Sequence, residues 1–291
     1  MTVFLTVVLA FAMFMQGIGF KLYARKCDST NEALMNSFNF LLSFVLVALY
    51  ALFTAETFAA SSLLYGIPYG VFFVAMVFFY NKSMSCGKIS FANFVLGMAM
   101  LIPIVAGALF LGEDISPLQI GGIVLFLIAS YFVCFGQGKD DKQMNKKAVL
   151  YGVLAFLSSG GMAVYIKVVS GIDSSIDQVQ MLASAMLTGF VLMTVLFACQ
   201  KGFVKIGEYL SYRWFWLSLL IVVICTAVGN TMYVNLVVLV PGAIFFPIAS
   251  GLPMLLGAAV SPLFKEKLSA KTITGIILGV VAIVLLNLKV G

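Results

Sequence analysis

The chain has 291 residues, of which 63% are hydrophobic and only 10% are charged, and its formal net charge is +6. An average soluble domain has about 25% charged residues, and a soluble fold could not bury this much apolar surface. The composition therefore excludes a soluble protein and predicts one whose solvent is the lipid bilayer.

Ten apolar segments follow one another along the chain, each close to the ~20 residues that a helix needs to cross a bilayer. They cover residues 2–20, 34–54, 61–80, 90–111, 117–136, 148–169, 179–199, 214–235, 242–264 and 272–289. Runs such as IVLFLIASYFVCF do not alternate as barrel strands do, so the segments predict helices, which satisfy their own backbone groups. We expect an all-α integral membrane protein with ten transmembrane helices. The first segment lacks a basic start and a cleavage site, and we interpret it as a retained helix rather than a signal peptide.

The charges alternate along the chain in step with these segments. Fifteen of the seventeen basic residues lie in the odd-numbered loops, counting each loop by the helix that it follows. The even-numbered loops carry acidic residues instead: Glu56, Glu113, Asp114, Asp173 and Asp177. Basic residues in short loops stay in the cytoplasm. The pattern predicts cytoplasmic odd-numbered loops and two outer termini, for a multi-pass protein of the plasma (inner) membrane.

Two lysines lie near equivalent helix ends in the two halves of the chain. Lys21 follows the first segment, and Lys167 lies at the end of the sixth. Long lysine side chains at such positions commonly reach out to the membrane interface, and we favour that interpretation. The alternative is that they bind a carboxylate of a substrate.

One stretch of the sequence occurs twice, at a constant offset of 153 residues. Residues 111–132 and 264–285 share seven identities: Glu113/Glu266, Ser116/Ser269, Ile120/Ile273, Gly122/Gly275, Ile123/Ile276, Leu125/Leu278 and Ala129/Ala282. We therefore expect two five-helix repeats, residues 1–136 and 148–291, joined by a cytoplasmic loop at 137–147. An odd number of helices per repeat inverts the second copy, as in many secondary transporters, whose inverted halves enclose a site near the middle of the membrane.

The sequence also resembles a known family. The first half reads FFYNKSMSCGKISFANFVLGMAMLIPIVAGALFLGEDISPLQIGGIVLFL, and the second half reads PGAIFFPIASGLPMLLGAAVSPLFKEKLSAKTITGIILG. These stretches are similar to the drug/metabolite transporter superfamily, EamA-like branch. The resemblance implies a ten-helix inverted-repeat fold and transport of small organic solutes. Members of the family usually have both termini inside, whereas the charge pattern of this chain favours termini outside.

Prolines and a few polar residues mark the candidate binding site. Proline inside a helix removes a backbone donor and kinks the helix, and broken helices commonly mark transporter sites. Pro68 is expected in the first turn of its helix, where proline is ordinary. The candidate residues of the cavity, taken from the kinked helices and from polar helix faces, are Asn39, Ser43, Pro103, Ser184, Thr188, Asn230, Tyr233, Ser250 and Pro253.

Two further patterns concern helix ends and packing. Glu113 and Glu266 precede the fifth and tenth segments, where acidic side chains stabilise helix starts, with Ser116 and Ser269 as N-caps. A role of either glutamate in a gate is the alternative. The motifs beginning at Gly66 and Gly275 have the small-xxx-small spacing that permits close helix contact.

The residues that are missing narrow the function. The chain contains no histidine, no phosphate-binding GxxxxGK[ST] loop and no carboxylate near the middle of a segment. We therefore expect no enzyme, no catalytic residue, no metal and no cofactor. The basic stretch KDDKQMNKK is a topology signal, so nucleic acid is not an expected partner, and nothing in the sequence decides the oligomeric state.

Our hypothesis is a secondary-active transporter, working by alternating access, for small neutral or zwitterionic metabolites such as amino acids. Its expected partners are the lipid bilayer, the small-molecule substrate and a coupling ion. Two alternatives remain. A proton-coupled exporter of cationic drugs or metabolites would depend on a pH gradient, and a passive solute channel would not saturate.

Overall fold

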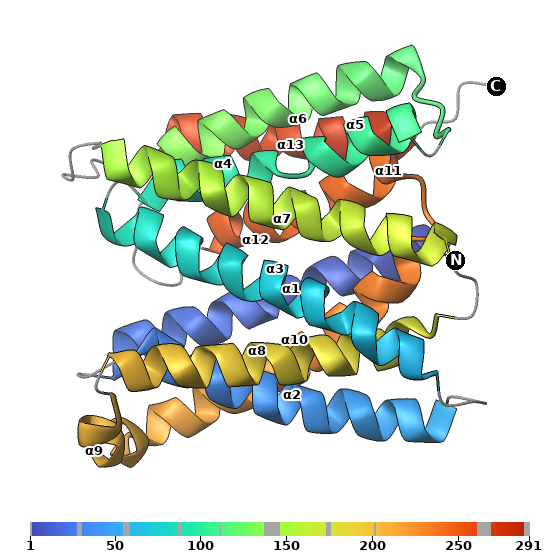
Figure 1. Ribbon diagram of the computed structural model, residues 1–291. Coiled ribbons are helices and arrows are strands. Elements are labelled where there is room, and N and C mark those ends of the chain that lie inside the picture. The colour runs from blue at the N-terminus through green and yellow to red at the C-terminus, as the bar shows by residue number, and fades with distance from the viewer. Residues whose placement is uncertain are drawn as a thin grey trace. The chain divides into compact units, whose positions relative to one another are not determined.

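The computed structural model describes residues 2–27, 31–54, 59–86, 89–110, 112–136, 146–172, 176–200, 202–260 and 269–287. The described residues form helices and no strand. In chain order the helices are α1 (Thr2–Lys26), α2 (Glu32–Thr54), α3 (Ala60–Cys86), α4 (Ile89–Met98), α5 (Leu101–Phe110), α6 (Pro117–Gly136), α7 (Lys146–Ile172), α8 (Gln178–Cys199), η1 (Gly202–Lys205), α9 (Ile206–Ser211), α10 (Arg213–Leu236), α11 (Gly242–Phe246), η2 (Pro247–Gly251), α12 (Leu252–Val260) and α13 (Ala270–Asn287) (Figure 1).

Seven helices of the described chain are long and apolar enough to cross a membrane. They cover Phe4–Tyr23, Glu32–Thr54, Ala60–Cys86, Phe91–Phe110, Lys146–Ile172, Gln178–Cys199 and Arg213–Leu236. Three shorter apolar helices cover Pro117–Val133, Gly242–Gly257 and Ala270–Leu286. All ten coincide with expected segments, but within the described residues only seven meet the length and hydropathy of a full span, so the number of ten crossings stays a prediction.

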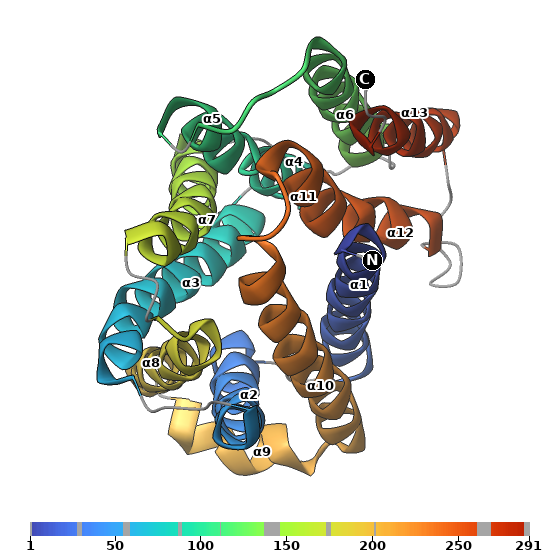
Figure 2. The same ribbon diagram turned by 90° about the vertical axis from the view of Figure 1, so that its right-hand side faces the viewer.

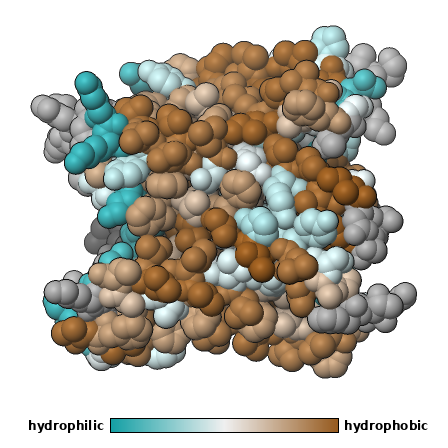
Figure 3. Space-filling model, viewed as in Figure 1, coloured by the Kyte–Doolittle hydropathy of each residue, from teal (hydrophilic) through white to brown (hydrophobic). Residues whose placement is uncertain are grey.

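The surface fits a lipid environment. Hydrophobic side chains cover most of the face seen in Figure 3, while the most hydrophilic residues gather toward the left and right of that view. Phe53 and Phe110 are 86% and 79% exposed. Water would make this exposure costly, whereas lipid tails are as apolar as these side chains.

The helix expected over 90–111 is interrupted. α4 ends at Met98, Ala99 and Met100 form a turn, and α5 begins at Leu101. Pro103 explains the position of the break, because its ring clashes with the carbonyl of the residue four positions earlier, Ala99, and it has no N–H to donate to it. The Ala99 carbonyl accepts a hydrogen bond from Ile102 N instead, at 3.2 Å.

The helix expected over 242–264 is interrupted as well. A π-helical segment, η2, separates α11 from α12 and begins at Pro247. Pro253 follows in α12, so two prolines remove two donors within seven residues of one helix. Single π-helical turns inside helices occur frequently at functional sites. The expected residues 261–264 of this helix lie outside the described part of the chain.

Two differences from the sequence prediction concern helix positions. Pro68 does not lie in a first turn, because α3 begins at Ala60 and continues through Pro68. The short helices η1 and α9 occupy a segment that was expected to be a loop. That loop contains the apolar residues Phe203, Val204 and Ile206 among its charges, and Tyr209 of α9 is buried in the core cluster around Phe197 and Phe215.

The helix starts are capped by side chains. Asp177 accepts hydrogen bonds from Val179 N and Gln180 N, both at 2.8 Å, at the start of α8. Ser116 and Gln119 form a reciprocal pair at α6, in which Gln119 N donates to Ser116 Oγ and Ser116 N donates to Gln119 Oε1. Ser269 accepts from Thr272 N at α13. The two serine caps predicted from the sequence are therefore confirmed.

We predict that Asp177→Ala lowers the free energy of unfolding by about 1 kcal/mol, because two donors at the start of α8 lose their acceptor. Thermal unfolding of the detergent-solubilised protein measures the change. Asp177→Asn keeps a side-chain acceptor and is the matched control, with little loss expected. Equal losses for both variants would mean that the carboxylate acts through its charge and not as a cap.

The contacts divide the chain into two units. Unit 1 comprises Met1–Ala10, Ala75–Val168 and Leu236–Gly291, and unit 2 comprises Phe11–Val74 and Val169–Asn235. Each unit contains helices from both halves of the sequence. The expected division into residues 1–136 and 148–291, with its linker loop, therefore stays a prediction about sequence repeats, and residues 137–145 of that loop lie outside the described part of the chain.

In unit 1, α6 and α13 pack side by side along their lengths (Figures 1 and 2). Gly122 of α6 faces Leu286 and the Ala282 carbonyl of α13, and Gly275 of α13 faces Val133 and the Ala129 carbonyl of α6. Because the start of each helix meets the end of the other, the two run antiparallel. The predicted packing role of Gly275 is confirmed.

In unit 2, α2 and α8 form a second antiparallel pair (Figures 1 and 2). Ser37 Oγ lies 2.7 Å from Thr194 Oγ1 across the pair, and Gly189 faces the ring of Phe40. The first part of α3 packs on α8 as well. A Cβ at Gly70 would lie only 2.6 Å from the Ala185 carbonyl oxygen, so the glycine permits the close approach.

Candidate functional site

Six of the nine candidate cavity residues belong to unit 2. Asn39 and Ser43 are buried on one face of α2, because residues four apart share a helix face. Ser43 Oγ lies 3.3 Å from Asn39 Oδ1 and 3.5 Å from the carbonyl oxygen of Val223 on α10. These two residues therefore form a polar contact between α2 and α10.

The polar residues of α10 continue this pattern. Thr226 Oγ1 accepts a hydrogen bond from Gln16 Nε2 of α1 at 2.6 Å. Asn230 is buried, and its Nδ2 donates to the Thr226 carbonyl at 2.9 Å. Tyr233, one turn further on, is half-buried and lies close enough to Tyr69 of α3 for the two phenol groups to interact electrostatically. The polar face predicted from the spacing of these residues on α10 is thus present in unit 2.

Ser184 and Thr188 on α8 have a different role. Ser184 Oγ donates to the Leu63 carbonyl of α3 at 2.6 Å, and Thr188 Oγ1 donates to the Ser184 carbonyl at 2.9 Å. Both hydroxyls are thus engaged with backbone, and they lie beside Gly66 and Gly70 in the contact between α3 and α8. The geometry favours helix packing over substrate contact for this pair.

The other three candidates belong to unit 1. Pro103 is buried in α5, Ser250 is exposed in η2, and Pro253 is half-buried in α12. Their part in the local structure is the pair of helix breaks described above. Gly251, beside Ser250, lies directly against the ring of Phe126 of α6, which leaves no space for a side chain.

Sequence reasoning did not single out the hydroxyl of Tyr69. Tyr69 is fully buried, and its hydroxyl has no hydrogen-bond partner in the described part of the protein. The sequence indicates an aromatic residue beside Pro68, but no spacing rule signals that a phenol will be buried without a partner. Such a group is costly, by about 1–3 kcal/mol, and requires a reason.

A second cluster contains a buried charge in unit 1. Lys167, near the end of α7, forms an ion pair with Glu113, which precedes α6. The lysine side chain is only 4% exposed and the glutamate side chain 24%. The ammonium also lies 5.5 Å from the centre of the Phe246 ring of α11, a cation–π distance. Lys167 is the one charged residue that is buried among the described residues.

Glu113 also binds the start of α11. Its Oε2 accepts a hydrogen bond from Gly242 N at 2.9 Å. The carboxylate therefore joins three segments: the end of α7 through Lys167, the start of α11 through Gly242, and its own segment before α6. Carboxylates are favourable at helix starts because several N–H groups there lack partners.

Glycines make this arrangement possible. Gly112 adopts a φ of 65°, in the left-handed region that favours glycine, and so turns the chain after α5. Glu113 N then donates back to the Gly107 carbonyl at 3.1 Å. A Cβ at Gly107 would lie 2.7 Å from Glu113 Oε2, and one at Gly242 would lie 3.1 Å from Lys167 Nζ. The backbone thus approaches the ion pair on two sides.

These contacts correct one prediction. Lys167 does not reach out to the membrane interface but is buried and paired. Ser116 caps α6 as predicted, while the Glu113 carboxylate accepts a hydrogen bond from Gly242 N at the start of α11, and the predicted part of Glu113 in a cap or a gate stays a prediction. Glu266 lies outside the described residues, so its predicted role stays untested.

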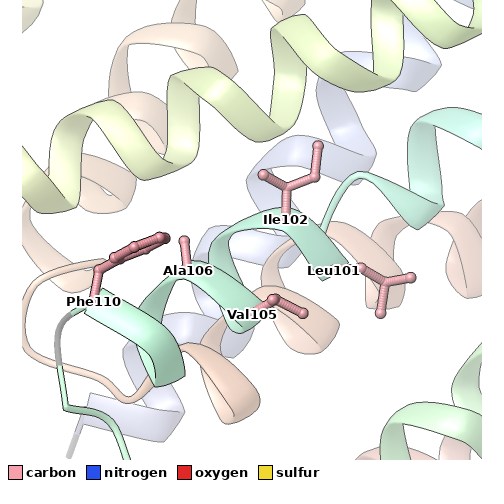
Figure 4. Close-up of a pocket in the computed structure, with 5 residues that line it drawn as sticks. All are labelled: Leu101, Ile102, Val105, Ala106 and Phe110. Atoms are coloured by element: carbon pink, nitrogen blue, oxygen red, sulfur yellow. The ribbon is translucent and has the colours of Figure 1, made fainter.

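A cavity of about 370 Å³ lies along α5 in unit 1, lined by Leu101, Ile102, Val105, Ala106 and Phe110. All five lining residues belong to one helix, and their side chains fan outward from it (Figure 4). Substrate pockets contain a few polar groups that orient the ligand, and this lining has none. The cavity suits a lipid chain better than a polar metabolite.

Comparison with known proteins identifies the second half of the chain. Residues 146–288 match the EamA-like transporter family, which is part of the drug/metabolite transporter superfamily. These residues belong to that family. EamA-like proteins are membrane transporters, and the resemblance stated from the sequence is confirmed for this part of the chain. Its apolar helices make the chain an integral multi-pass membrane protein.

A solved structure shares the fold of nearly the whole chain. One crystal structure, described only as that of a protein, matches with a TM-score of 0.73 over 99% of this chain and 98% of its own, at 13% sequence identity. At that identity the fold is all that the two proteins demonstrably share. No curated protein matches the chain.

Proposed function

We propose that this EamA-like protein is a secondary-active transporter that moves small neutral or zwitterionic metabolites, such as amino acids, by alternating access. The observation that carries the proposal is a pair of equivalent contacts between α6 and α13, one in each copy of the repeat. In transporters built from inverted repeats, the two halves enclose the substrate site and move against each other around it.

The equivalence of the two contacts follows from the repeat offset of 153 residues. Gly122 faces Ala282 and Leu286, and its counterpart Gly275 faces Ala129 and Val133. Adding 153 to Ala129 and Val133 gives Ala282 and Leu286. Each contact is thus converted into the other by the repeat, as a two-fold relation between the copies requires. This supports two inverted five-helix repeats and, with them, ten transmembrane crossings.

The interior chemistry supports the substrate class. The buried polar side chains of unit 2 are amides and hydroxyls, among them Asn39, Ser43, Thr226 and Asn230. The buried cation of unit 1, Lys167, is already neutralised by Glu113. A cationic drug would need an unpaired carboxylate to offset its loss of hydration, and none is buried among the described residues. A solute without net charge fits this interior best.

We further propose that the Glu113–Lys167 pair closes one end of unit 1 as a gate. The pair joins α7, α11 and the segment before α6, so separating these elements requires breaking it. An ion pair suits this role because its partners regain hydration when water enters, which offsets much of the lost attraction. From the charge distribution of the loops we propose that this end faces the outer side of the plasma membrane, with both termini outside.

Counterflow in proteoliposomes tests the proposed function. Vesicles preloaded with unlabelled amino acids, nucleosides or sugars are diluted into the same labelled compound, and accelerated, saturable uptake is expected for a neutral or zwitterionic solute. Exchange restricted to cationic drugs and driven by a pH gradient would overturn the substrate class. Free leakage without saturation would favour a channel.

We predict that replacing Asn39, Asn230 and Tyr233 together, by Ala, Ala and Phe, reduces the kcat/KM of this exchange by about ten- to a thousandfold. Three lost hydrogen bonds of about 0.5–1.5 kcal/mol each have this effect. The matched control replaces Asn36 and Asn235 by Ala, because these amides lie on the same two helices outside the candidate site and donate to the Glu32 and Thr231 carbonyls. Equal activity of the triple variant and the control would show that Asn39, Asn230 and Tyr233 do not bind the substrate.

A further inference from the structure

Tyr69 of α3 combines complete burial with an unused hydroxyl. Its side chain is 0% exposed, and its hydroxyl contacts no donor or acceptor in the part of the chain that the structure describes. Nearby polar residues of unit 2 differ in this respect. Ser43, Ser184, Thr188 and Asn230 all donate to a side chain or a carbonyl. Tyr69 thus carries a donor that the protein itself leaves available.

The backbone around Tyr69 is closely packed against a neighbouring helix. Gly66 and Gly70 hold this part of α3 directly against the backbone of α8. Ser184 Oγ adds a 2.6 Å hydrogen bond to the Leu63 carbonyl. A tyrosine ring is rigid beyond two side-chain torsions, so its hydroxyl position is set by this packing. The orphaned donor is therefore a fixed feature of the site.

The neighbouring residue breaks the regular hydrogen bonding of the helix. Pro68 lies inside α3 and has no N–H to donate to the carbonyl of Leu64, four residues earlier. Substrate sites of transporters are commonly formed where helices lose regular hydrogen bonds within the membrane. Tyr233 of α10 lies near Tyr69 in unit 2. A helix irregularity, a free donor and a second phenol therefore meet at one place.

We propose that the Tyr69 hydroxyl is a substrate-binding group that donates a hydrogen bond to the carboxylate of a zwitterionic solute. The proposal rests on the function proposed above and names the group of the substrate that is recognised. A phenol donates a charge-assisted hydrogen bond to a carboxylate, about twice as strong as a bond between neutral groups.

The absence of a buried cation among the described residues of unit 2 specifies the substrate further. A simple anion would be bound there without a counter-charge, at a high cost in desolvation. A zwitterion carries its own ammonium group and is neutral as a whole. Neutral donors such as Tyr69 suffice to orient it, so an α-amino acid fits this site better than a carboxylic acid.

Tyr69→Phe tests the proposal with two readouts, because phenylalanine keeps the ring and removes only the hydroxyl. The first readout is thermal unfolding without substrate, for which we expect a higher melting temperature, since a buried group without a partner is removed. The second is counterflow of each of the twenty labelled L-amino acids, for which we expect an apparent affinity about ten- to a hundredfold lower than in the wild type.

Ser218→Ala is the matched control. Ser218 of α10 is also fully buried with a hydroxyl that lacks a partner among the described residues, but it lies beside Gly19 of α1, away from the tyrosines. We expect this variant to unfold at a higher temperature and to transport as the wild type does. The control thus separates the stability effect of an orphaned hydroxyl from recognition of a substrate.

Each remaining outcome overturns a specific statement. A lower melting temperature of Tyr69→Phe would mean that the hydroxyl has a structural partner, and unchanged affinity for every exchanged amino acid would mean that it does not contact the substrate. Either result overturns the tyrosine proposal while leaving the transporter proposal intact. If the wild type exchanges none of the twenty amino acids, the zwitterion class itself is wrong and the tyrosine proposal fails with it.

Discussion

Glu113→Ala is expected to lower the free energy of unfolding by about 3–5 kcal/mol, the usual cost of removing one partner of a buried ion pair. Lys167 has a side chain that is only 4% exposed, so its ammonium cannot recover its hydration when the carboxylate is lost. The start of α11 loses its acceptor at Gly242 N at the same time. Thermal unfolding in detergent, followed by tryptophan fluorescence, measures the effect.

Two further variants separate charge from packing. Asp114→Ala removes the adjacent acidic residue, which is exposed, and is expected to change stability by less than about 0.5 kcal/mol. Adding Lys167→Met to Glu113→Ala removes the orphaned charge and keeps most of the side-chain volume. We expect this double variant to regain most of the lost stability, because apolar side chains often replace buried ion pairs without loss.

The same variants test the gate. If the pair only stabilises the fold, the stable double variant transports as the wild type does. If the pair closes one end of unit 1, the double variant keeps its stability but shows an altered rate of exchange. Additive losses in Glu113→Ala and Lys167→Met, with no recovery in the double variant, would contradict the coupling of the two charges altogether.

This ion pair also illustrates where sequence reasoning ends. Lys167 and Glu113 were each given a local role, at the interface and at the start of α6, because spacing rules connect residues within one helix turn or cap. The pair joins residues 54 positions apart. No periodicity signals such a contact.

Helix positions could be predicted more reliably, since apolar runs of membrane length have few alternatives in lipid. Segment 117–136 agrees with α6 at both ends, and the caps at Ser116 and Ser269 followed from residue type and position. The breaks in the fourth and ninth segments followed from their prolines. The form of each break, a turn at Ala99–Met100 and a π-helical segment at Pro247–Gly251, depends on packing and could not be read from the sequence.

The repeated stretch, residues 111–132 and 264–285, predicted that two helices correspond to each other. The residue pattern within either helix alone does not reveal this correspondence. The glycines, serines and glutamates of the stretch could be aligned, but the alignment alone did not say that the two copies touch. The structure adds that information, because Gly122 of α6 faces Ala282 of α13 and the equivalent Gly275 of α13 faces Ala129 of α6. Substitution of Gly122 or Gly275 therefore tests whether these glycines are needed for α6 and α13 to pack closely.

The largest packing effect is expected for Gly275→Ala, at about 1–3 kcal/mol of lost stability. A Cβ there would lie 2.8 Å from the Ala129 carbonyl oxygen and 2.8 Å from Val133 N. Both are backbone atoms, so no side chain can rotate away, and α6 and α13 must move apart. Thermal unfolding in detergent is again the measurement.

Gly121 and Gly122 supply graded controls on the facing helix. A Cβ at Gly121 meets nothing within 4 Å, so Gly121→Ala is expected to be neutral or slightly stabilising, because alanine favours helix over glycine. At Gly122 the nearest atom is Leu286 Cγ at 2.8 Å, a side chain that can adopt another rotamer. We therefore expect Gly122→Ala to cost less than Gly275→Ala and more than Gly121→Ala. Any other order would mean that the α6–α13 contact is looser than these distances require, and it would remove the main support for a two-fold relation between the repeats.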